Sequence, residues 1–235
     1  MRATLVADID GPVVRTLAVE PPLGTKLRLD GRAAVEVWLL STGATLLEGD
    51  ELCVRLRARG GARVHVRSVA SQLVHPCPMG RPARWDVHVV LEDEASLCWW
   101  PEPTIVAAGA NYRARATVTM AAGARLAWAD ELVLGRSGES AGDVALHTEL
   151  RVDGPGGPRV RDGFSDHPGW LGPAVTGGAR YLGTRVVTGP GPGPGDAPAG
   201  PGWTPLAGGG WSRRLVADDV ATGRRQLGVD DRVRS

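Results

Sequence analysis

The sequence has few of the residues that mark secreted or membrane proteins. Its 235 residues include three cysteines, Cys53, Cys77 and Cys98, and this odd number argues against a disulfide framework. No stretch approaches the about 18–20 apolar residues of a transmembrane helix. Acidic residues occupy the N-terminal stretch, where a signal peptide needs an apolar core. These absences predict a soluble, cytoplasmic protein with no membrane contact.

Net charge and aromatic side chains are also scarce. Lys and Arg total 27 against 26 Asp and Glu, so nothing indicates a nucleic-acid partner. One Phe and two Tyr leave eight Trp, with Val, Leu and Ala, to fill the core. The five histidines show no His-x-x-x-His or Glu-x-x-His spacing, and no Gly-x-Ser-x-Gly motif is present. The sequence therefore predicts neither a closed metal site nor a nucleophilic active site.

What the chain does have is a repeated alternation of apolar and polar residues. Around alanines 62, 95 and 124, apolar residues stand at positions −8, −6, −4, +2 and +4, and the same frame fits Ala33 and, in degraded form, Pro158. Period-two alternation on both sides of a short turn is typical of half-buried antiparallel strands. Recurrence at roughly 30 residues indicates stacked units. An ordinary β-sandwich with similar hairpins is the alternative.

This pattern predicts a single, mainly β domain over residues 1–235, in which stacked antiparallel strand pairs form a β-superhelix or layered sheets. Alternating Pro and Gly over residues 189–202 predict a flexible loop, because Pro lacks a donor and Gly loses most entropy on ordering. Leu215, Val216 and Val220 at near-helical spacing predict a helix over residues 211–227. One or two helices near the C-terminus are expected in all.

Four acidic residues are the main candidates for a functional site in this chain. Asp130 and Glu131 follow an apolar run, Glu139 lies across the glycine turn that holds Arg136, and Glu102 stands between two prolines. If these carboxylates lie close together or line a cavity, they can hold a hard or borderline cation transiently. The alternative is an Arg136–Glu ion pair that closes the loop.

Several short segments occur in a definite order along the chain: Leu40–Gly43 with Glu48–Asp50, Trp100–Ile105, Gly109–Tyr112, Glu131–Arg136, Gly138–Glu139, Asp153–Gly154 and the basic Arg213–Leu215. In this order and spacing they resemble the UreD/UreH family of urease accessory proteins. The motif positions that the resemblance singles out are Pro101, Pro103, Thr104, Gly135, Arg136 and Gly138.

The resemblance implies a non-enzymatic, β-rich superhelical scaffold in the cytoplasm. It implies that the protein bridges the urease apoprotein and the UreF-type and UreG-type accessory proteins, in an assembly that is 2:2 if it forms through the UreF-type dimer. It also implies nickel in transit and no tightly bound cofactor, with weak contacts to Glu131, Glu139, Asp130 or Glu102. On this interpretation, Glu131→Ala or Glu139→Ala lowers urease activation more than it lowers folding.

Two other classes of function stay open at this point. A β-sandwich hydrolase could use the acidic loop residues Asp130, Glu131 or Glu139. A β-rich binding module could instead hold an anionic ligand on a stripe of arginines that alternate with the apolar positions of one strand pair: Arg55, Arg57, Arg59, Arg63 and Arg67.

Overall fold

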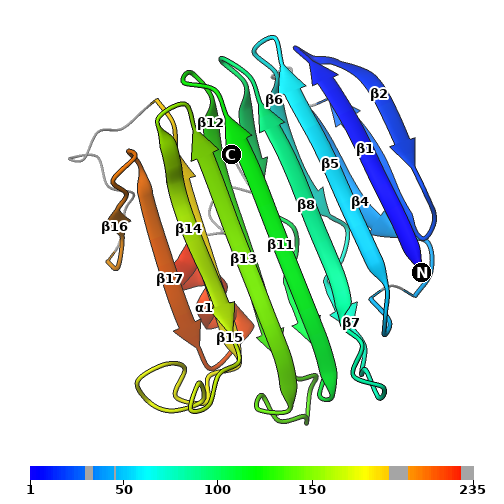
Figure 1. Cartoon of the computed structure of the whole chain (residues 1–235), viewed down its shortest axis with the longest axis vertical. Helices are drawn as coiled ribbons and strands as arrows, with labels where there is room; N and C mark the ends of the chain where they lie inside the picture. Colours follow the sequence, from blue (N-terminus) through cyan, green and yellow to red (C-terminus); the bar gives the residue numbers. More distant parts are fainter. Residues whose placement is uncertain (30–33, 45, 191–200, 229–235) are drawn as a thin grey trace.

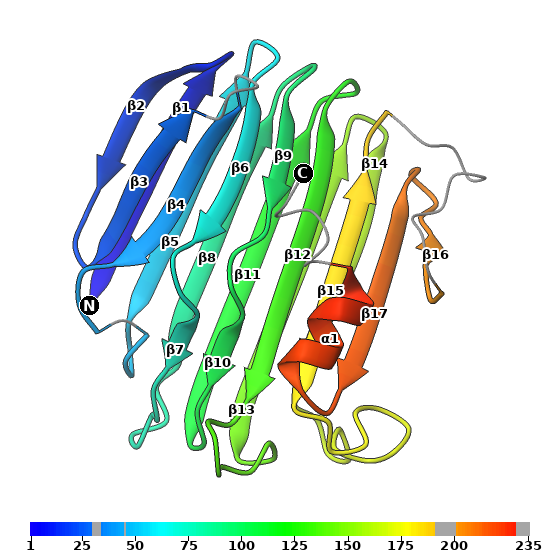
Figure 2. The ribbon, with the colours of Figure 1, turned by 180° about the vertical axis from the view of Figure 1, so that it is seen from behind.

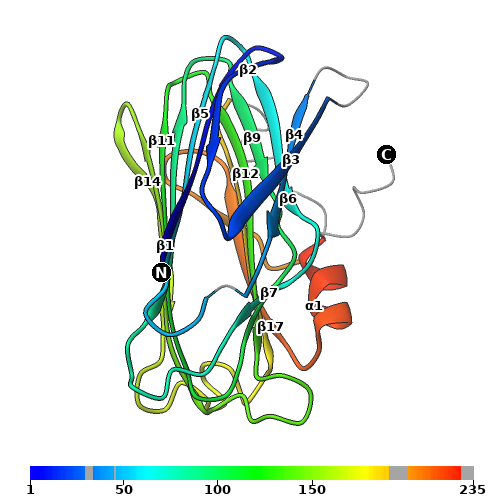
Figure 3. The ribbon, with the colours of Figure 1, turned by 90° about the vertical axis from the view of Figure 1, so that its right-hand side faces the viewer.

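The computed structural model describes residues 1–29, 34–44, 46–190 and 201–228. These residues form two β-sheets packed face to face, with one helix, α1 (Val220–Leu227), on the outside (Figures 1 and 3). Sheet A has seven strands, in the spatial order β14 (Gly157–Ser165), β13 (Val144–Gly154), β11 (Ala110–Met120), β8 (Ala83–Leu91), β5 (Glu51–Arg59), β1 (Arg2–Asp10) and β2 (Val13–Val19).

Sheet B has ten strands. Eight lie in the spatial order β16 (Thr204–Pro205), β17 (Trp211–Ala217), β15 (Tyr181–Thr188), β12 (Arg125–Leu134), β9 (Ser96–Trp99), β6 (Arg63–Ser68), β4 (Val35–Ser41) and β3 (Leu23–Leu29). The short β10 (Thr104–Val106) pairs with β12, and β7 (Gln72–Val74) pairs with β10.

Each of the three best repeats contributes one strand to each sheet. The buried alanines Ala62, Ala95 and Ala124 stand at the turns between β5 and β6, β8 and β9, and β11 and β12. Equivalent strands of successive repeats pair in parallel, β5 with β8 and β8 with β11 in sheet A, β6 with β9 and β9 with β12 in sheet B. The predicted mainly β, layered, superhelical fold is therefore confirmed. The two strands of a repeat run in opposite directions but face each other across the core (Figures 1 and 2).

The two ends of the repeat array differ from its middle. Around Pro158, β13 and β14 form a hydrogen-bonded antiparallel hairpin within sheet A. The repeat centre at Ala33 lies outside the described residues. Antiparallel strands β2 and β3 border the other end, paired with β1 and β4. The parallel stack is thus limited at each end by antiparallel pairs.

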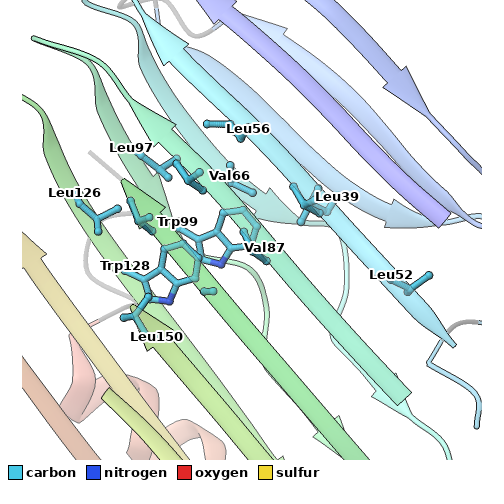
Figure 4. Packing of buried hydrophobic residues seen from close by; sticks show 14 of the residues in the cluster. Leu39, Leu52, Leu56, Val66, Val87, Leu97, Trp99, Leu126, Trp128 and Leu150 are labelled. Carbon is cyan, nitrogen blue, oxygen red and sulfur yellow. The ribbon is translucent and has the colours of Figure 1, made fainter. Parts of the chain in front are cut away.

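The core lies between the sheets and contains the inward residues of every repeat. Trp99 of β9 and Trp128 of β12 stand at paired positions, and their rings stack with centroids 4.7 Å apart (Figure 4). Both are about 1% exposed. Such an aromatic pair contributes about 0.5–1.5 kcal/mol beyond its buried area. Tryptophans therefore fill the volume that phenylalanine, almost absent here, occupies in other cores.

The C-terminal region corrects the helix predicted over residues 211–227. Residues Trp211–Ala217 form strand β17, which pairs antiparallel with β15, and the helix covers only Val220–Leu227. The ladder along β15 satisfies a full row of backbone groups, which outweighs a weak helical spacing of apolar residues. Arg213–Leu215 consequently belong to a strand and not to a basic helix.

Helix α1 has defined ends and lies on the outer face of sheet B (Figure 2). At its N-terminus, the Asp219 side chain accepts a hydrogen bond from the Thr222 amide, which satisfies one of the unpaired donors. At its C-terminus, Gly228 adopts a left-handed conformation with φ 72°. No helix among the described residues has the length and apolarity needed to cross a membrane. Most of the predicted 189–202 loop lies outside the described residues.

Candidate functional site

Asp130 and Glu131, which are adjacent in the sequence, lie on opposite faces of strand β12. Asp130 continues the inward phase of Leu126 and Trp128 and lines a cavity between the sheets. Glu131 lies on the opposite, outer face, under α1, and is only 5% exposed. Because successive side chains of a strand point to opposite faces, these two carboxylates cannot share one metal ion.

Glu131 belongs to a cluster that attaches α1 to sheet B. Arg224 of α1 lies between two carboxylates: its Nη1 donates to Glu102 Oε2 at 2.5 Å, and its Nε is 3.4 Å from Glu131 Oε2. The Tyr181 hydroxyl donates to the same Glu131 oxygen at 2.8 Å. Glu102 is held in place by its own amide, which donates to Ser68 Oγ. The structure thus brings Glu102 and Glu131 together, around an arginine 122 residues from Glu102 in the chain.

Glu139 closes a loop of its own, away from that cluster. Its carboxylate accepts hydrogen bonds from the Arg136 side chain (2.7 Å), the Arg136 amide (2.8 Å) and the Ala108 amide (2.9 Å). These donors, the Arg136 guanidinium first, hold the pKa of Glu139 down at about 2. The loop at Arg136 and Glu139 therefore has the geometry of the alternative interpretation, in which an Arg136–Glu ion pair closes the loop.

The motif glycines and prolines shape the segments that carry these acids. Gly135 has φ 74° and Gly138 has φ 83°, and a Cβ on Gly135 would lie about 3.1 Å from the Ser140 carbonyl oxygen. The buried Pro103 offers its carbonyl to the Gln72 amide, which leads the chain into β10 at Thr104. Pro101 and Thr104 both border the cavity. These residues have architectural roles, and Thr104 also contributes a hydroxyl to the cavity wall.

The cavity between the sheets has a volume of about 670 Å³ and a partly polar wall. Asp130, Thr184 and Arg214 stand at paired positions on β12, β15 and β17 of sheet B. Sheet A contributes Tyr112, Thr148 and Asp162, and Glu102 also borders the space. The Arg214 guanidinium donates to the Asp162 carboxylate and to the Gly163 carbonyl, so one side chain connects the two sheets across the cavity.

Asp130 is the cavity residue with the most altered acidity. Burial raises the pKa of its carboxyl to about 6, and the Asp162 carboxylate adds to the rise, while the Trp128 indole acts in the opposite direction. Burial also raises the pKa of Tyr112 far above its usual value, so its phenol stays neutral. Near neutral pH, the cavity wall therefore combines a mostly ionised Asp130 carboxylate with neutral hydroxyls and with the Arg214–Asp162 ion pair.

Asp130 was expected from the sequence as a candidate site residue, but its partners in the cavity wall were not. The sequence pattern indicated that Asp130 faces inward, because it stands two residues after Trp128 and four after Leu126, in the same period-two alternation. Asp162 likewise continues the inward phase of Val160. Arg214 had no such signal, because the sequence placed it on a helix. Among the described residues, no group of three His, Cys, Asp or Glu side chains is arranged to hold a metal ion.

The arginine stripe is divided between the two sheets. Arg55, Arg57 and Arg59 belong to β5 of sheet A, whereas the other two lie on β6 of sheet B. Arg57 pairs with Glu92, and Arg59 pairs with two aspartates of β1. The expected continuous basic surface is therefore divided between two sheets, and two of its five arginines are paired with acids.

Two stacked β-layers with a partly polar cavity between them, and with the outer acids engaged by arginines, define a β-solenoid-like protein. The family model of the UreD urease accessory protein matches residues 7–228 of this chain. The chain is 36% identical over 224 residues to the urease accessory protein UreD of Streptomyces coelicolor, covering 92% of this chain and 88% of that protein. It is 35% identical over 257 residues to the urease accessory protein UreD of a Parafrankia species, covering 96% and 86%. The chain belongs to the UreD urease accessory protein family, as the order of its motifs predicted.

Proposed function

We propose that the protein acts in urease maturation as a non-catalytic cytoplasmic scaffold that helps nickel reach the apo-urease. Membership of the urease accessory family supports the urease context. The observation that carries the nickel part is the cavity of about 670 Å³ in which Asp130 stands among the hydroxyls of Tyr112, Thr148 and Thr184. The outer acids are less suited to this role, because Glu131 and Glu139 are engaged by arginines.

The chemistry of the cavity wall suits a cation that must be released again. A buried carboxylate has lost part of its hydration, which is why the pKa of Asp130 is raised to about 6. A divalent cation that displaces the proton restores part of that lost stabilisation. Carboxylate and hydroxyl oxygens bind borderline cations such as Ni²⁺ more weakly than thiolates or imidazoles do. Contact with Asp130 is therefore favourable but exchangeable.

The scaffold part of the proposal concerns partner proteins. We infer that the chain bridges the urease apoprotein and the UreF-type and UreG-type accessory proteins, with a 2:2 stoichiometry through the UreF-type dimer. Among the described residues, no helix lies on the outer face of sheet A, whereas α1 lies on the outer face of sheet B (Figures 1 and 2). One face is a bare sheet and the other carries a helix, and this difference supports contact with two different partners.

A reconstitution with co-expressed urease subunits and accessory proteins tests both parts. Asp130→Asn is compared with Asp143→Asn, a matched change at an exposed loop position. We expect Asp130→Asn to lower the nickel content and activity of urease while co-purification with the partners is unchanged. Equal nickel content in the two variants would rule out the cavity route. A wild-type chain that co-purifies with neither urease nor the UreF-type protein would rule out the scaffold.

The hydrolase alternative receives no support from the geometry. A general acid and base must face one reacting group, but Asp130 and Glu131 lie on opposite faces of β12 and Glu139 is closed onto Arg136. The anionic-ligand alternative is also weakened, because its arginines lie on two sheets and those at 57 and 59 are paired with acids.

A further inference from the structure

A second, smaller cavity of about 230 Å³ lies at sheet B and contains a cysteine beside a histidine. His65 of β6 and Cys98 of β9 stand at paired positions on neighbouring parallel strands. The inward neighbours of both residues, Val64 and Val66 on β6 and Leu97 and Trp99 on β9, are buried in the core. Alternation therefore points the imidazole and the thiol outward, on the same face.

The pairing distance suits a shared metal ion. Neighbouring strands lie about 4.7–4.9 Å apart, so side chains at paired positions on one face meet without backbone movement. A metal bound to sulfur at about 2.3 Å and to nitrogen at about 2.0–2.1 Å requires those two atoms to be closer than this strand spacing. The positions of the two residues are set by the sheet and not by a loop.

The surroundings leave room for an ion and its remaining ligands. The residue paired with Cys98 on the next strand is Ala127, whose small side chain leaves space above the sheet. The cavity continues past Val187 to Trp211, and Ser96 and Arg125 also line it. The space therefore combines two soft or borderline ligands with an apolar floor that favours their side-chain contact with a metal over contact with water.

We propose that His65 and Cys98 form a two-ligand site for a thiophilic divalent cation of the Ni²⁺ or Zn²⁺ class on the outer face of sheet B. Thiolate and imidazole select these cations over Mg²⁺ and Ca²⁺. Two protein ligands leave the other coordination positions to solvent or to a partner's side chain, so the ion is exchangeable. This inference goes beyond the proposed function, because it concerns a different face from the Asp130 cavity.

The test is a titration of the purified full-length chain with Ni²⁺ alone, followed by thiolate-to-nickel charge-transfer absorption in the near ultraviolet. We expect one equivalent to produce the band in the wild type and no band in Cys98→Ser. Loss of a residue that only orients a metal ligand costs about 10–100-fold in metal affinity, so loss of the ligand itself in His65→Ala is expected to weaken binding by at least about 100-fold. Cys53→Ser is the matched control, because Cys53 is equally half-buried but is paired with Thr4 and Asp86.

Alkylation gives a second measurement that does not depend on the optical band. Ni²⁺ should protect Cys98 from iodoacetamide, but should not protect Cys53, and this protection should disappear in His65→Ala. A band that survives Cys98→Ser, a band that is lost equally in Cys53→Ser, or a wild type without band or protection would overturn the proposal. Neither measurement involves urease, so its failure leaves the Asp130 route untouched, and failure of the reconstitution leaves this site untouched.

Discussion

Replacing Asp130 by asparagine should stabilise the protein near neutral pH while impairing nickel delivery. The carboxyl has a pKa of about 6 in the folded chain against an ordinary value of 3.8. Each pKa unit corresponds to about 1.4 kcal/mol, so ionising this group costs the folded state up to about 3 kcal/mol relative to the unfolded state. Because the side chain still contacts the cavity, about 1–3 kcal/mol is the expected gain. Asparagine keeps the shape and removes the charge.

The sign of the effect sets its pH dependence. At about pH 3 or lower, below both pKa values, the carboxyl is protonated in both states, so the charge costs nothing and the two proteins should be equally stable. Between the unfolded value of 3.8 and the folded value of about 6, the unfolded chain releases its proton first and the wild type loses stability. Above pH 6 the difference should be constant. Urea unfolding of Asp130→Asn and the wild type at pH 4, 5, 6 and 7 measures this profile.

Two results would refute the reasoning. If Asp130→Asn is less stable than the wild type at pH 7, the carboxylate is held by favourable contacts and is structural. If it is more stable by the same amount at pH 4 and pH 7, the gain does not come from the charge. The control is Asp143→Asn, which removes the same charge at an exposed loop position outside the cavity. A stabilised Asp130→Asn that still activates urease fully would show that the cavity charge is not used for nickel.

Three further substitutions test the anchoring of α1 and of the acidic loop. Gly223→Ala should destabilise the chain by up to about 2 kcal/mol in thermal unfolding, because an added Cβ would lie 2.2 Å from the Tyr181 ring. This overpacking outweighs the helical preference of alanine. The control Gly156→Ala, where an added Cβ meets open space, should be neutral or slightly stabilising. Glu131→Ala should cost about 1–3 kcal/mol in urea unfolding, because Arg224 keeps Glu102 but loses one carboxylate, and the buried Tyr181 hydroxyl loses its acceptor. Glu139→Gln should loosen its loop at pH 7, which is measured as faster amide exchange in the variant than in the wild type. This difference in exchange rate should fade as the pH falls from 4.5 towards 2, where the wild-type carboxylate becomes protonated.

The repeat could be predicted from the sequence because burial follows the alternation directly. The turns at Ala62, Ala95 and Ala124 all stand between the strands that the pattern required. Period two reports which side chains face the core, but it does not report which strand accepts the backbone hydrogen bonds. The assignment of each repeat's two strands to opposite sheets therefore appeared only in the structure.

In the candidate site, only contacts between residues close together in the sequence could be predicted. The Glu139–Arg136 pair lies within one loop, so local spacing was enough to propose it. The contact of Arg224 with Glu102 joins segments 122 residues apart, and no spacing rule reaches that far. The prediction that Arg214 lies on a helix was wrong for a related reason. Its strand forms because β15 offers a hydrogen-bonding edge, and this contact depends on the tertiary fold and not on local sequence.

The alternation of β12 also decides which acid can report on function. The sequence-based expectation was that Glu131→Ala or Glu139→Ala lowers urease activation more than folding. Glu131 holds α1 through Arg224, so its loss affects stability first, and lower activation in that variant says nothing about nickel. Asp130, one residue away, has the opposite character: its charge costs stability where it stands. A variant that stabilises the fold but lowers activation would separate nickel transfer from architecture, and we expect Asp130→Asn to be that variant.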